Sequence, residues 1–241
     1  MILAWDAFVS EMPTPAACVT AGRAQVVRRW EGLGYHRRAV ALHGAASAIV
    51  ERHAGEVPAA LDALVALPGV GPYTARAVLA FAFERDVGVV DTNVARILSR
   101  AVAGRPLGAR ESQGLADRLV TPGRGWAHNQ AMLDFGALTC SARPDCGGCA
   151  LRRSCAWARA GYPSPDPAAA TAGTSRPQPR FKGSDRELRG RILSLARAAR
   201  PGAGWRDELE AEFSDERVDA ALRALEREGL IAARGRRLAL A

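Results

Sequence analysis

The chain has 241 residues, of which 48% are hydrophobic, so it can build a sizeable core, and disorder is excluded as its main state. Its formal charge is +8, from 33 Lys and Arg against 25 Asp and Glu, which favours a nucleic acid over a membrane surface as partner. No signal-peptide pattern opens the sequence, and no apolar run reaches the roughly 20 residues of a membrane span. We therefore expect an intracellular protein without a membrane partner.

Short helices are predicted throughout the first 160 residues, because apolar side chains recur there at helical spacing and no alternating strand pattern stands out. Thr14 and Pro15 give one of these helices a capped start. Residues 87–90 are expected to be extended. The helices are expected over 1–11, 15–21, 23–31, 35–53 and 59–66, then over 73–83, 92–102, 111–120 and 126–138. This pattern predicts an all-α globular fold.

Two glycines separate two of these helices in the stretch LPGVG at 67–71. Glycine allows the tight turn, and Pro72 suits the first turn of the helix that follows. Such a start leaves backbone N–H groups pointing outward, where a phosphate oxygen binds well. An ordinary helix-helix connection is the alternative. The candidate DNA contacts of this hairpin are Leu67, Gly69, Val70 and Gly71.

Four of the five cysteines are crowded into one loop, Cys140, Cys146, Cys149 and Cys155. The crowding indicates metal ligation rather than disulfides. Only one Cys-x2-Cys pair is present, whereas a zinc ribbon normally has two, so a [4Fe–4S] cluster fits better than zinc; buried, unligated thiols are the remaining alternative. Cys18 lies far away and is expected in the core. The loop also carries Arg143, Arg152 and Arg153, which are either a solvated surface or part of a DNA-facing surface.

The last third of the sequence changes character. Residues 163–183 are rich in Pro, Ala, Gly and Ser and are expected to form a linker. Helices are then predicted over 185–199, 205–213 and 215–228, followed by two strands within 230–240, an arrangement similar to a winged-helix unit. Arg234, Arg236 and Arg237 in its turn are either DNA contacts or a solvated tip. The expected domains are 1–160, a linker at 161–183, and 184–241.

Several stretches, taken together, resemble the helix-hairpin-helix base-excision glycosylases that carry an iron-sulfur cluster, and within them the adenine DNA glycosylases of the MutY group. The cysteine loop completes a set whose order and spacing match that superfamily. The matching stretches are WEGLGYHRRA at 30–39, LPGVGPYTARAVLAFAF at 67–83, VVDTNVARILSR at 89–100 and NQAMLDFGA at 129–137.

The resemblance implies roles for three residues. Asp91 matches the aspartate that stabilises the oxocarbenium-like sugar as the N-glycosidic bond breaks, although its position also suits a helix N-cap. Asn93 matches the residue that positions this carboxylate. Tyr73 stands where the endonuclease III branch has a lysine that forms a Schiff base, so a monofunctional glycosylase is implied. An ordinary helix-face aromatic is the other interpretation of Tyr73.

The resemblance also implies double-stranded DNA with a mispaired or damaged base as partner, adenine opposite 8-oxoguanine or guanine as substrate, and a nucleoid-associated monomer in the cytoplasm. The catalytic glutamate segment of the family has no match here, and Glu11 does not replace it, so we expect an N-terminally incomplete form whose activity is open. The first cysteine gap is one residue short, and a smaller unit stands in place of the large oxoguanine-recognition domain. A non-catalytic iron-sulfur DNA-binding homologue and an endonuclease III-type lyase are the alternatives.

Overall fold

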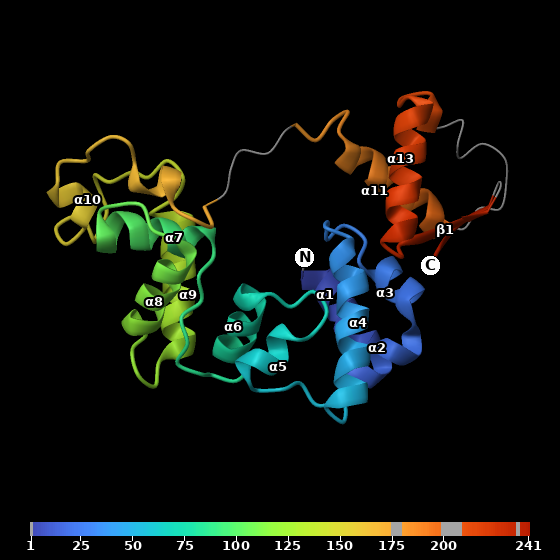
Figure 1. The fold of residues 1–241 in the computed structure, drawn as a ribbon, viewed down its shortest axis with the longest axis horizontal. Helices are drawn as coiled ribbons and strands as arrows, with labels where there is room; N and C mark the ends of the chain where they lie inside the picture. Colours follow the sequence, from blue (N-terminus) through green and yellow to red (C-terminus); the bar gives the residue numbers. More distant parts are fainter. Residues whose placement is uncertain (1, 175–179, 199–208, 235–236) are drawn as a thin grey trace. The chain divides into compact units, whose positions relative to one another are not determined.

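A computed structural model describes residues 2–174, 180–198, 209–234 and 237–241 of the chain (Figure 1). The chain divides into two compact units. Unit 1 consists of Met1–Pro58, Ala66–Gly69 and Gln178–Ala241, and unit 2 consists of Ala59–Val65 and Val70–Pro177. Unit 1 therefore joins the two ends of the chain, and the 1–160, 161–183 and 184–241 boundaries expected from the sequence stay a prediction.

Among its described residues, unit 1 begins with helices α1 to α4 and ends with α11, α13 and a strand pair. The sequence signals explain the start of the second helix: the Thr14 hydroxyl accepts a hydrogen bond from the Ala17 N–H at 3.1 Å, and Pro15 occupies the first turn. The described elements are α1 (Ile2–Glu11), α2 (Pro15–Ala21), α3 (Arg23–Arg29), α4 (Arg37–Arg52), α11 (Asp185–Ala198), α13 (Asp215–Arg227), β1 (Ile231–Arg234) and β2 (Arg237–Leu240).

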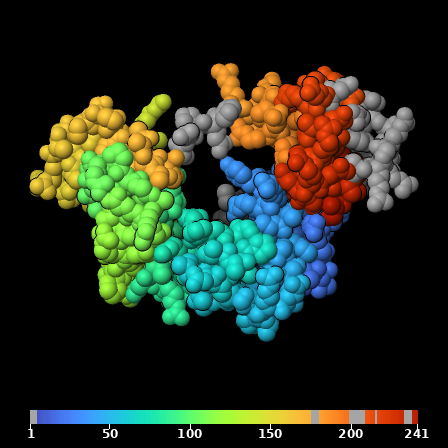
Figure 2. All heavy atoms as spheres, viewed as in Figure 1, coloured from blue at the N-terminus to red at the C-terminus, as the bar shows by residue number. Residues whose placement is uncertain are grey.

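One apolar cluster holds unit 1 together across the whole length of the chain. Val26 and Val27 of α3 pack in the same cluster as Ile192 of α11 and Leu225 of α13, and all four are fully buried. Cys18 belongs to this cluster too, which confirms its predicted place in the core. Figure 2 shows α11 and α13 packed against the N-terminal helices. Burial of this apolar surface is what attaches the last third of the chain to the first.

The C-terminal strands form a two-stranded antiparallel sheet in which Ile231 pairs with Leu240 and Arg234 with Arg237. The predicted strand pair is therefore present. The helix predicted over 205–213 falls largely outside the described residues, as does Arg236 in the turn. The described elements of the expected winged-helix unit are thus two helices and the strand pair.

Unit 2 contains the end of the hairpin from Val70 onward, the aspartate and the cysteine loop, whereas Leu67, Pro68 and Gly69 of the hairpin belong to unit 1. Its elements are α5 (Leu61–Val65), α6 (Pro72–Phe81), α7 (Thr92–Ile97), the π-helix η1 (Leu98–Ala103), α8 (Ala109–Leu119), α9 (Gly125–Leu138), α10 (Ala156–Arg159) and the 3₁₀ helix η2 (Pro167–Ala170). Its small apolar cluster is built from Val94, Leu98, Leu107 and Ala116. In the described part of the chain, no helix is long and apolar enough to cross a membrane.

The structure differs from the sequence expectation at three places in unit 2. The helix predicted over 92–102 changes to π geometry after Ile97, and α10 was not predicted. Part of the expected linker is folded: η2 lies at 167–170, where Pro167 and Ala168 are buried. The side chain of Asp166 caps this segment, and short apolar contacts stabilise it. Neither feature requires apolar residues at a regular spacing, so the composition of the sequence suggested a linker.

Candidate functional site

Asp91 lies at the N-terminus of α7 and caps that helix. Its Oδ1 atom accepts hydrogen bonds from the backbone N–H groups of Asn93 and Val94, each at 2.8 Å. Its Oδ2 atom accepts a hydrogen bond from the side-chain amide of Asn93, also at 2.8 Å. These bonds satisfy two N–H groups of the first helical turn and fix the plane of the carboxylate. The N-cap interpretation of Asp91 is confirmed, and Asn93 contacts the carboxylate as the resemblance implied.

A buried arginine connects this carboxylate to the cysteine loop. Arg96 is 8% exposed, and its Nη2 donates to Asn93 Oδ1 at 2.6 Å and to the Gly136 carbonyl at 2.9 Å. Its Nε donates to the carbonyl of Cys140 at 3.1 Å. A continuous path of hydrogen bonds therefore leads from Asp91 through Asn93 and Arg96 to the first cysteine.

The helices α7 and α9 approach closely beside Asn93. A Cβ atom on Gly136 would lie 2.7 Å from Asn93 Cβ and 2.8 Å from the Asn93 carbonyl oxygen. No larger residue fits there without displacing backbone. Because Gly136 has no side chain, α9 approaches α7 closely enough for the Gly136 carbonyl to accept a hydrogen bond from Arg96. The backbone of Gly136 also packs against Asn93.

A second buried amide holds the extended segment that leads into Asp91. Asn129 of α9 is 2% exposed. Its Oδ1 accepts from the Val89 N–H, and its Nδ2 donates to the carbonyls of Val87 and Gly125, all at 2.8 Å. Residues 87–90 pair with no strand in the described part of the chain, so Asn129 supplies hydrogen bonds to Val87 and Val89 that a sheet would otherwise provide, while Asp117 and Gln113 bond Gly88 between them.

Tyr73 and the hairpin surround the start of α6. Tyr73 lies in the first turn of α6 and is 47% exposed. Gly69 has φ +71°, and a Cβ atom there would overlap Cβ of Ala41, so the position requires glycine. Leu67 is buried, so any DNA contact at this residue falls to its backbone. Val70 is partly buried and Gly71 is exposed.

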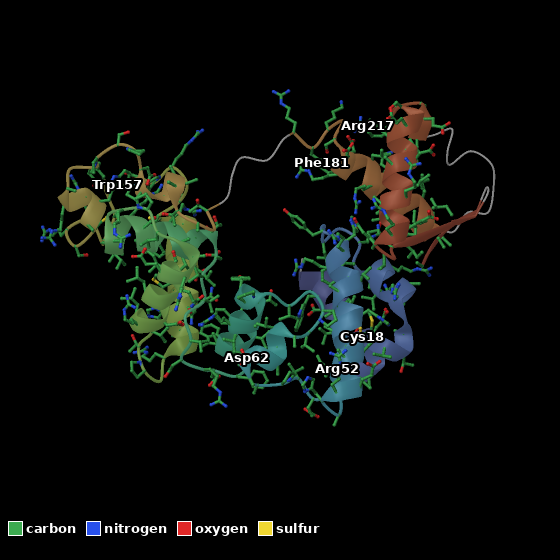
Figure 3. All side chains as sticks on the ribbon, in the orientation of Figure 1. Cys18, Arg52, Asp62, Trp157, Phe181 and Arg217 are labelled. Carbon is green, nitrogen blue, oxygen red and sulfur yellow. The ribbon has the colours of Figure 1, made fainter. Side chains whose placement is uncertain are left out.

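The four cysteines of the loop line a single small cavity. Cys140 follows the end of α9, and Cys155 precedes α10. Cys146 and Cys149 lie between them, and all four are partly buried. The cavity is closed by apolar side chains and by Arg100. Figure 3 labels one of these side chains, Trp157 of α10. Within the described residues, no three His, Cys, Asp or Glu side chains are grouped closely enough to hold a single metal ion.

Arg100 of the π-helix η1 is a buried side chain that binds the start of the cysteine loop. It is 2% exposed, and its Nε and Nη2 bind the two oxygens of Asp166 at 2.9 and 2.6 Å. Its Nη1 donates to the Ser141 carbonyl at 2.7 Å and lies 3.6 Å from Cys140 Sγ. The ring of Trp157 lies 5.5 Å from the guanidinium carbon. Arg100 therefore ties the start of the cysteine loop to the segment that follows it.

Burial and Arg100 act in opposite directions on nearby ionisable groups. Burial raises the pKa of Cys140 above its ordinary value, and the hydrogen bond and charge of Arg100 only partly offset this. Burial also acts to raise the pKa of Asp166, but there the Arg100 hydrogen bond, together with the Ala168 N–H, prevails and lowers it. Asp166 is thus the stable anionic partner of the buried guanidinium.

The remaining predicted contacts are surface residues. Arg143, Arg152 and Arg153 are exposed on the cysteine loop in unit 2. Arg236 lies outside the described residues, and the side chains of Arg234 and Arg237 are likewise not described. The continuous DNA-facing surface expected from the hairpin and this loop stays a prediction.

The sequence interpretation assigned no role to Arg96, Arg100, Asn129 or Asp166. One signal was available: two arginines fall within the apolar helix VARILSRAV, where a charge needs a buried partner. Their partners lie about 40 to 66 positions away along the chain, so spacing alone could not identify them.

Comparison with known proteins adds a family model and a similar protein sequence to this geometry. A family model described as helix-hairpin-helix motif matches residues 52–81. An adenine DNA glycosylase from Mycobacterium tuberculosis (strain CDC 1551 / Oshkosh) is 45% identical over 201 residues, which cover 81% of this chain and 64% of that protein. The chain thus spans less than two thirds of the length of this relative.

Solved structures match the fold. A thermostable thymine-DNA glycosylase aligns with a TM-score of 0.59 at 25% identity, over 65% of this chain and 75% of that one. A trapped endonuclease III–DNA covalent intermediate aligns with a TM-score of 0.56 at 24% identity, over 66% and 76%. The helical, helix-hairpin-helix glycosylase fold expected from the sequence is confirmed.

Proposed function

We propose that this chain, a homologue of adenine DNA glycosylases, is a base-excision repair enzyme that removes adenine paired with 8-oxoguanine or guanine in double-stranded DNA. The observation that carries the proposal is the held carboxylate of Asp91. Three N–H donors from Asn93 and Val94 fix its position on a helix cap, and Asn93 is itself packed against Gly136 of α9. A rigid negative group of this kind stabilises positive charge that develops in a transition state.

In the proposed reaction, the adenine nucleotide leaves the base stack, and its N-glycosidic bond breaks with the electron pair moving to the departing base. The sugar then carries oxocarbenium-like positive charge, which Asp91 stabilises before water adds to the anomeric carbon. The water loses a proton as it adds, and the departing adenine takes up a proton from the solvent, so that both products are neutral. Asn93 holds the carboxylate, and Arg96 holds Asn93. We assign Tyr73 a place at this site without covalent chemistry, because a phenol forms no Schiff base.

The cysteine loop supports a [4Fe–4S] cluster held by Cys140, Cys146, Cys149 and Cys155. All four thiols line one cavity, and Arg100 offers positive charge beside it. Each thiolate would bind a different iron of the cube, so the four need not converge on one point as the ligands of a single ion do. When bound, the cluster supplies a rigid cross-link of the loop. Four cysteines around one cavity suit cluster ligation better than they suit the role of unligated thiols in an apolar core.

DNA contacts are proposed at the hairpin and the exposed arginines. Gly69, Val70 and Gly71 precede the first turn of α6, where backbone N–H groups favour a phosphate. Arg143, Arg152 and Arg153 add exposed positive charge on the cysteine loop. We also propose that 184–241 is a winged-helix-like unit; two helices and a strand pair support this.

The reaction is tested by Asp91→Asn, measured as single-turnover release of adenine from an 8-oxoguanine duplex. The assay uses the 241-residue chain and, if the gene has in-frame codons upstream, the longer product as well. We expect a loss of about 10³-fold or more with unchanged DNA affinity. Asp62→Asn, on the exposed face of α5, is the matched control and should leave the rate unchanged. Full activity of Asp91→Asn would remove Asp91 from its role.

The same assay separates the alternatives. Tight DNA binding without adenine release by any wild-type form would favour a non-catalytic DNA-binding protein. A covalent complex trapped with borohydride would favour the lyase, which Tyr73 argues against. Iron analysis of purified protein should give about four atoms per chain; zinc in its place would overturn the cluster.

A further inference from the structure

Unit 1 contains a large cleft that the proposed reaction does not use. It has a volume of about 1320 Å³ and is bordered by the turn between α3 and α4, by one face of α11 and by the end of α13. Six arginines line it, against two glutamates, Glu31 and Glu228. Phe181, labelled in Figure 3 on the segment that leads into α11, lies at its edge and is 60% exposed. The cleft is therefore strongly basic and large enough for part of a polymer.

One arginine in this cleft is buried and has few partners among the described residues. The side chain of Arg197 is 8% exposed, and its Nε is closed to solvent without a hydrogen-bond partner in the described part of the chain. Its Nη1 lies 3.6 Å from Glu31, which is itself 64% exposed, and its Nη2 lies 3.4 Å from the Val27 carbonyl. Burial lowers the pKa of Arg197 from its ordinary value. A buried guanidinium with two long contacts is costly unless an anion also binds it.

Two further groups line the same cleft as Arg197: the imidazole of His36 and the guanidinium of Arg189. Burial lowers the pKa of His36, and the positive charges of Arg197 and Arg189 lower it further against the opposing effect of Glu31. Arg189 already shares Glu228 with Arg37, at 2.5 and 3.9 Å. An uncharged imidazole beside two guanidinium groups offers an N–H donor to an oxyanion.

We propose that this cleft binds a phosphate group of a DNA strand, held by Arg189 and Arg197 with His36 as an additional donor. The assignment to DNA rests on the proposed function and on one further contact: Gly69 of the hairpin lines the same cleft. The cleft far exceeds the size of a single phosphate ion, which favours a polymer over free phosphate. The C-terminal helix α11 thereby becomes part of the DNA-binding surface rather than an appended module.

The test measures the affinity for an undamaged duplex by fluorescence anisotropy over a series of salt concentrations. Arg189→Gln and Arg197→Gln should each weaken binding about tenfold and lower the slope of log K against log salt by about 1. Arg223→Gln, an exposed arginine of α13 outside the cleft, removes the same charge and is the matched control. It should leave both quantities nearly unchanged. Equal effects of all three variants would overturn the proposal.

Glu228→Gln gives a result of opposite sign. Removing the acid that competes for Arg189 should tighten duplex binding about threefold, an outcome that a merely structural role of the pair does not produce. Weaker binding by a folded Glu228→Gln would count against the site. Circular dichroism shows whether Arg197→Gln folds; if it does not, Arg189→Gln and Glu228→Gln decide.

Titration with inorganic phosphate, followed by NMR of the His36 ring, separates the two sources of phosphate. A shift of the ring signals by both phosphate and duplex supports the proposal. A shift by phosphate alone, with duplex affinity unaffected by the arginine variants, overturns DNA as the ligand. None of these measurements uses adenine release. Failure of the cleft with adenine release intact, or the reverse, therefore identifies which of the two proposals is wrong.

Discussion

The interiors of the two units are built from different kinds of interaction. Unit 1 is closed by one apolar cluster to which α3, α11 and α13 all contribute fully buried aliphatic side chains. Unit 2 has a smaller apolar cluster around Val94 and Leu98, with further buried aliphatic side chains such as Leu64 and Ile97. Every described residue that is polar and buried as a whole also lies in this unit: Arg96, Ser99, Arg100, Ser112, Asn129 and Thr171.

This difference corresponds to what each unit has to do. Apolar burial is non-directional and tolerates small shifts, which suffices to attach α11 to α3. Hydrogen bonds from Asn129 and Arg96 are directional, and they fix the extended segment before Asp91 and the asparagine beside it. We infer that the buried polar residues of unit 2 provide positional accuracy at a carboxylate.

The largest effect is expected from Ile192→Ala in unit 1. Ile192 is fully buried in the apolar cluster, so the substitution should lower the free energy of unfolding by about 4 kcal/mol through lost burial and a residual cavity. Hydrogen exchange should show lost protection in α3 and α11. If peptides from α7 and α9 lose protection equally, the two units unfold as one, and the comparison fails.

Asn129→Ala should destabilise unit 2 by about 3 kcal/mol. The substitution leaves the Val89 N–H and the Val87 carbonyl without their partner in a buried place. It should also slow adenine release, because the segment before Asp91 becomes mobile. Gln130→Ala on the exposed face of α9 is the matched control. Chemical denaturation measures both, and a near-zero change for Asn129→Ala would contradict the role of the polar interior.

Asp166→Asn should cost about 2 kcal/mol and act on the cysteine loop. Arg100 would keep its buried charge but lose the carboxylate that compensates it. Since the folded-state pKa of Asp166 is lowered, its contribution to stability is present above the unfolded pKa of about 4 and is lost as the pH falls through the folded value. The variant should therefore lose this acid dependence. Thermal melting between pH 3 and 7, followed with iron retention, checks both; an unchanged acid profile would exclude the pair.

The smallest effect concerns His43 of unit 1. Burial, then the charge of Arg23, lower its pKa, and its Nε2 is buried without a partner. The unfolded chain therefore binds more protons below about pH 6.5, and stability falls from there toward the lower folded value. We expect less than about 1 kcal/mol. His43→Gln should flatten this dependence in melting curves, whereas His53→Gln at the end of the same helix should not.

Local features of this fold could be predicted from the sequence. Thr14 and Pro15 define the start of α2, and Asp91 defines the start of α7, because capping depends on residues within one turn. The cysteine loop could also be predicted, because its four cysteines lie close together in the sequence. The hairpin at 67–71 was found from glycines whose backbone conformation is required locally.

Features that depend on distant partners could not be predicted. The buried position of Arg100 is explained only by its pairing with Asp166, which is distant in sequence. Asn129 likewise has no visible role in the sequence, because its partners at residues 87 and 89 lie on another segment. The docking of α11 on α3 has no sequence signal either, because Ile192 and Val26 are generic core residues. Such pairings are set by three-dimensional packing, which neither the periodicity of apolar residues nor the spacing of motifs predicts.

The discontinuous composition of unit 1 sets an order of events during synthesis. Its core requires residues 188–238, whereas unit 2 is complete at Pro177. At roughly 5–20 residues per second, the N-terminal helices emerge from the ribosome on the order of ten seconds before their partners α11 and α13. Unit 2 can close in that interval, and α4 is already available to pack on α2 and α3. The part of the unit 1 core that α11 and α13 cover is still exposed at that time, and a chaperone that acts during translation would meet its substrate there.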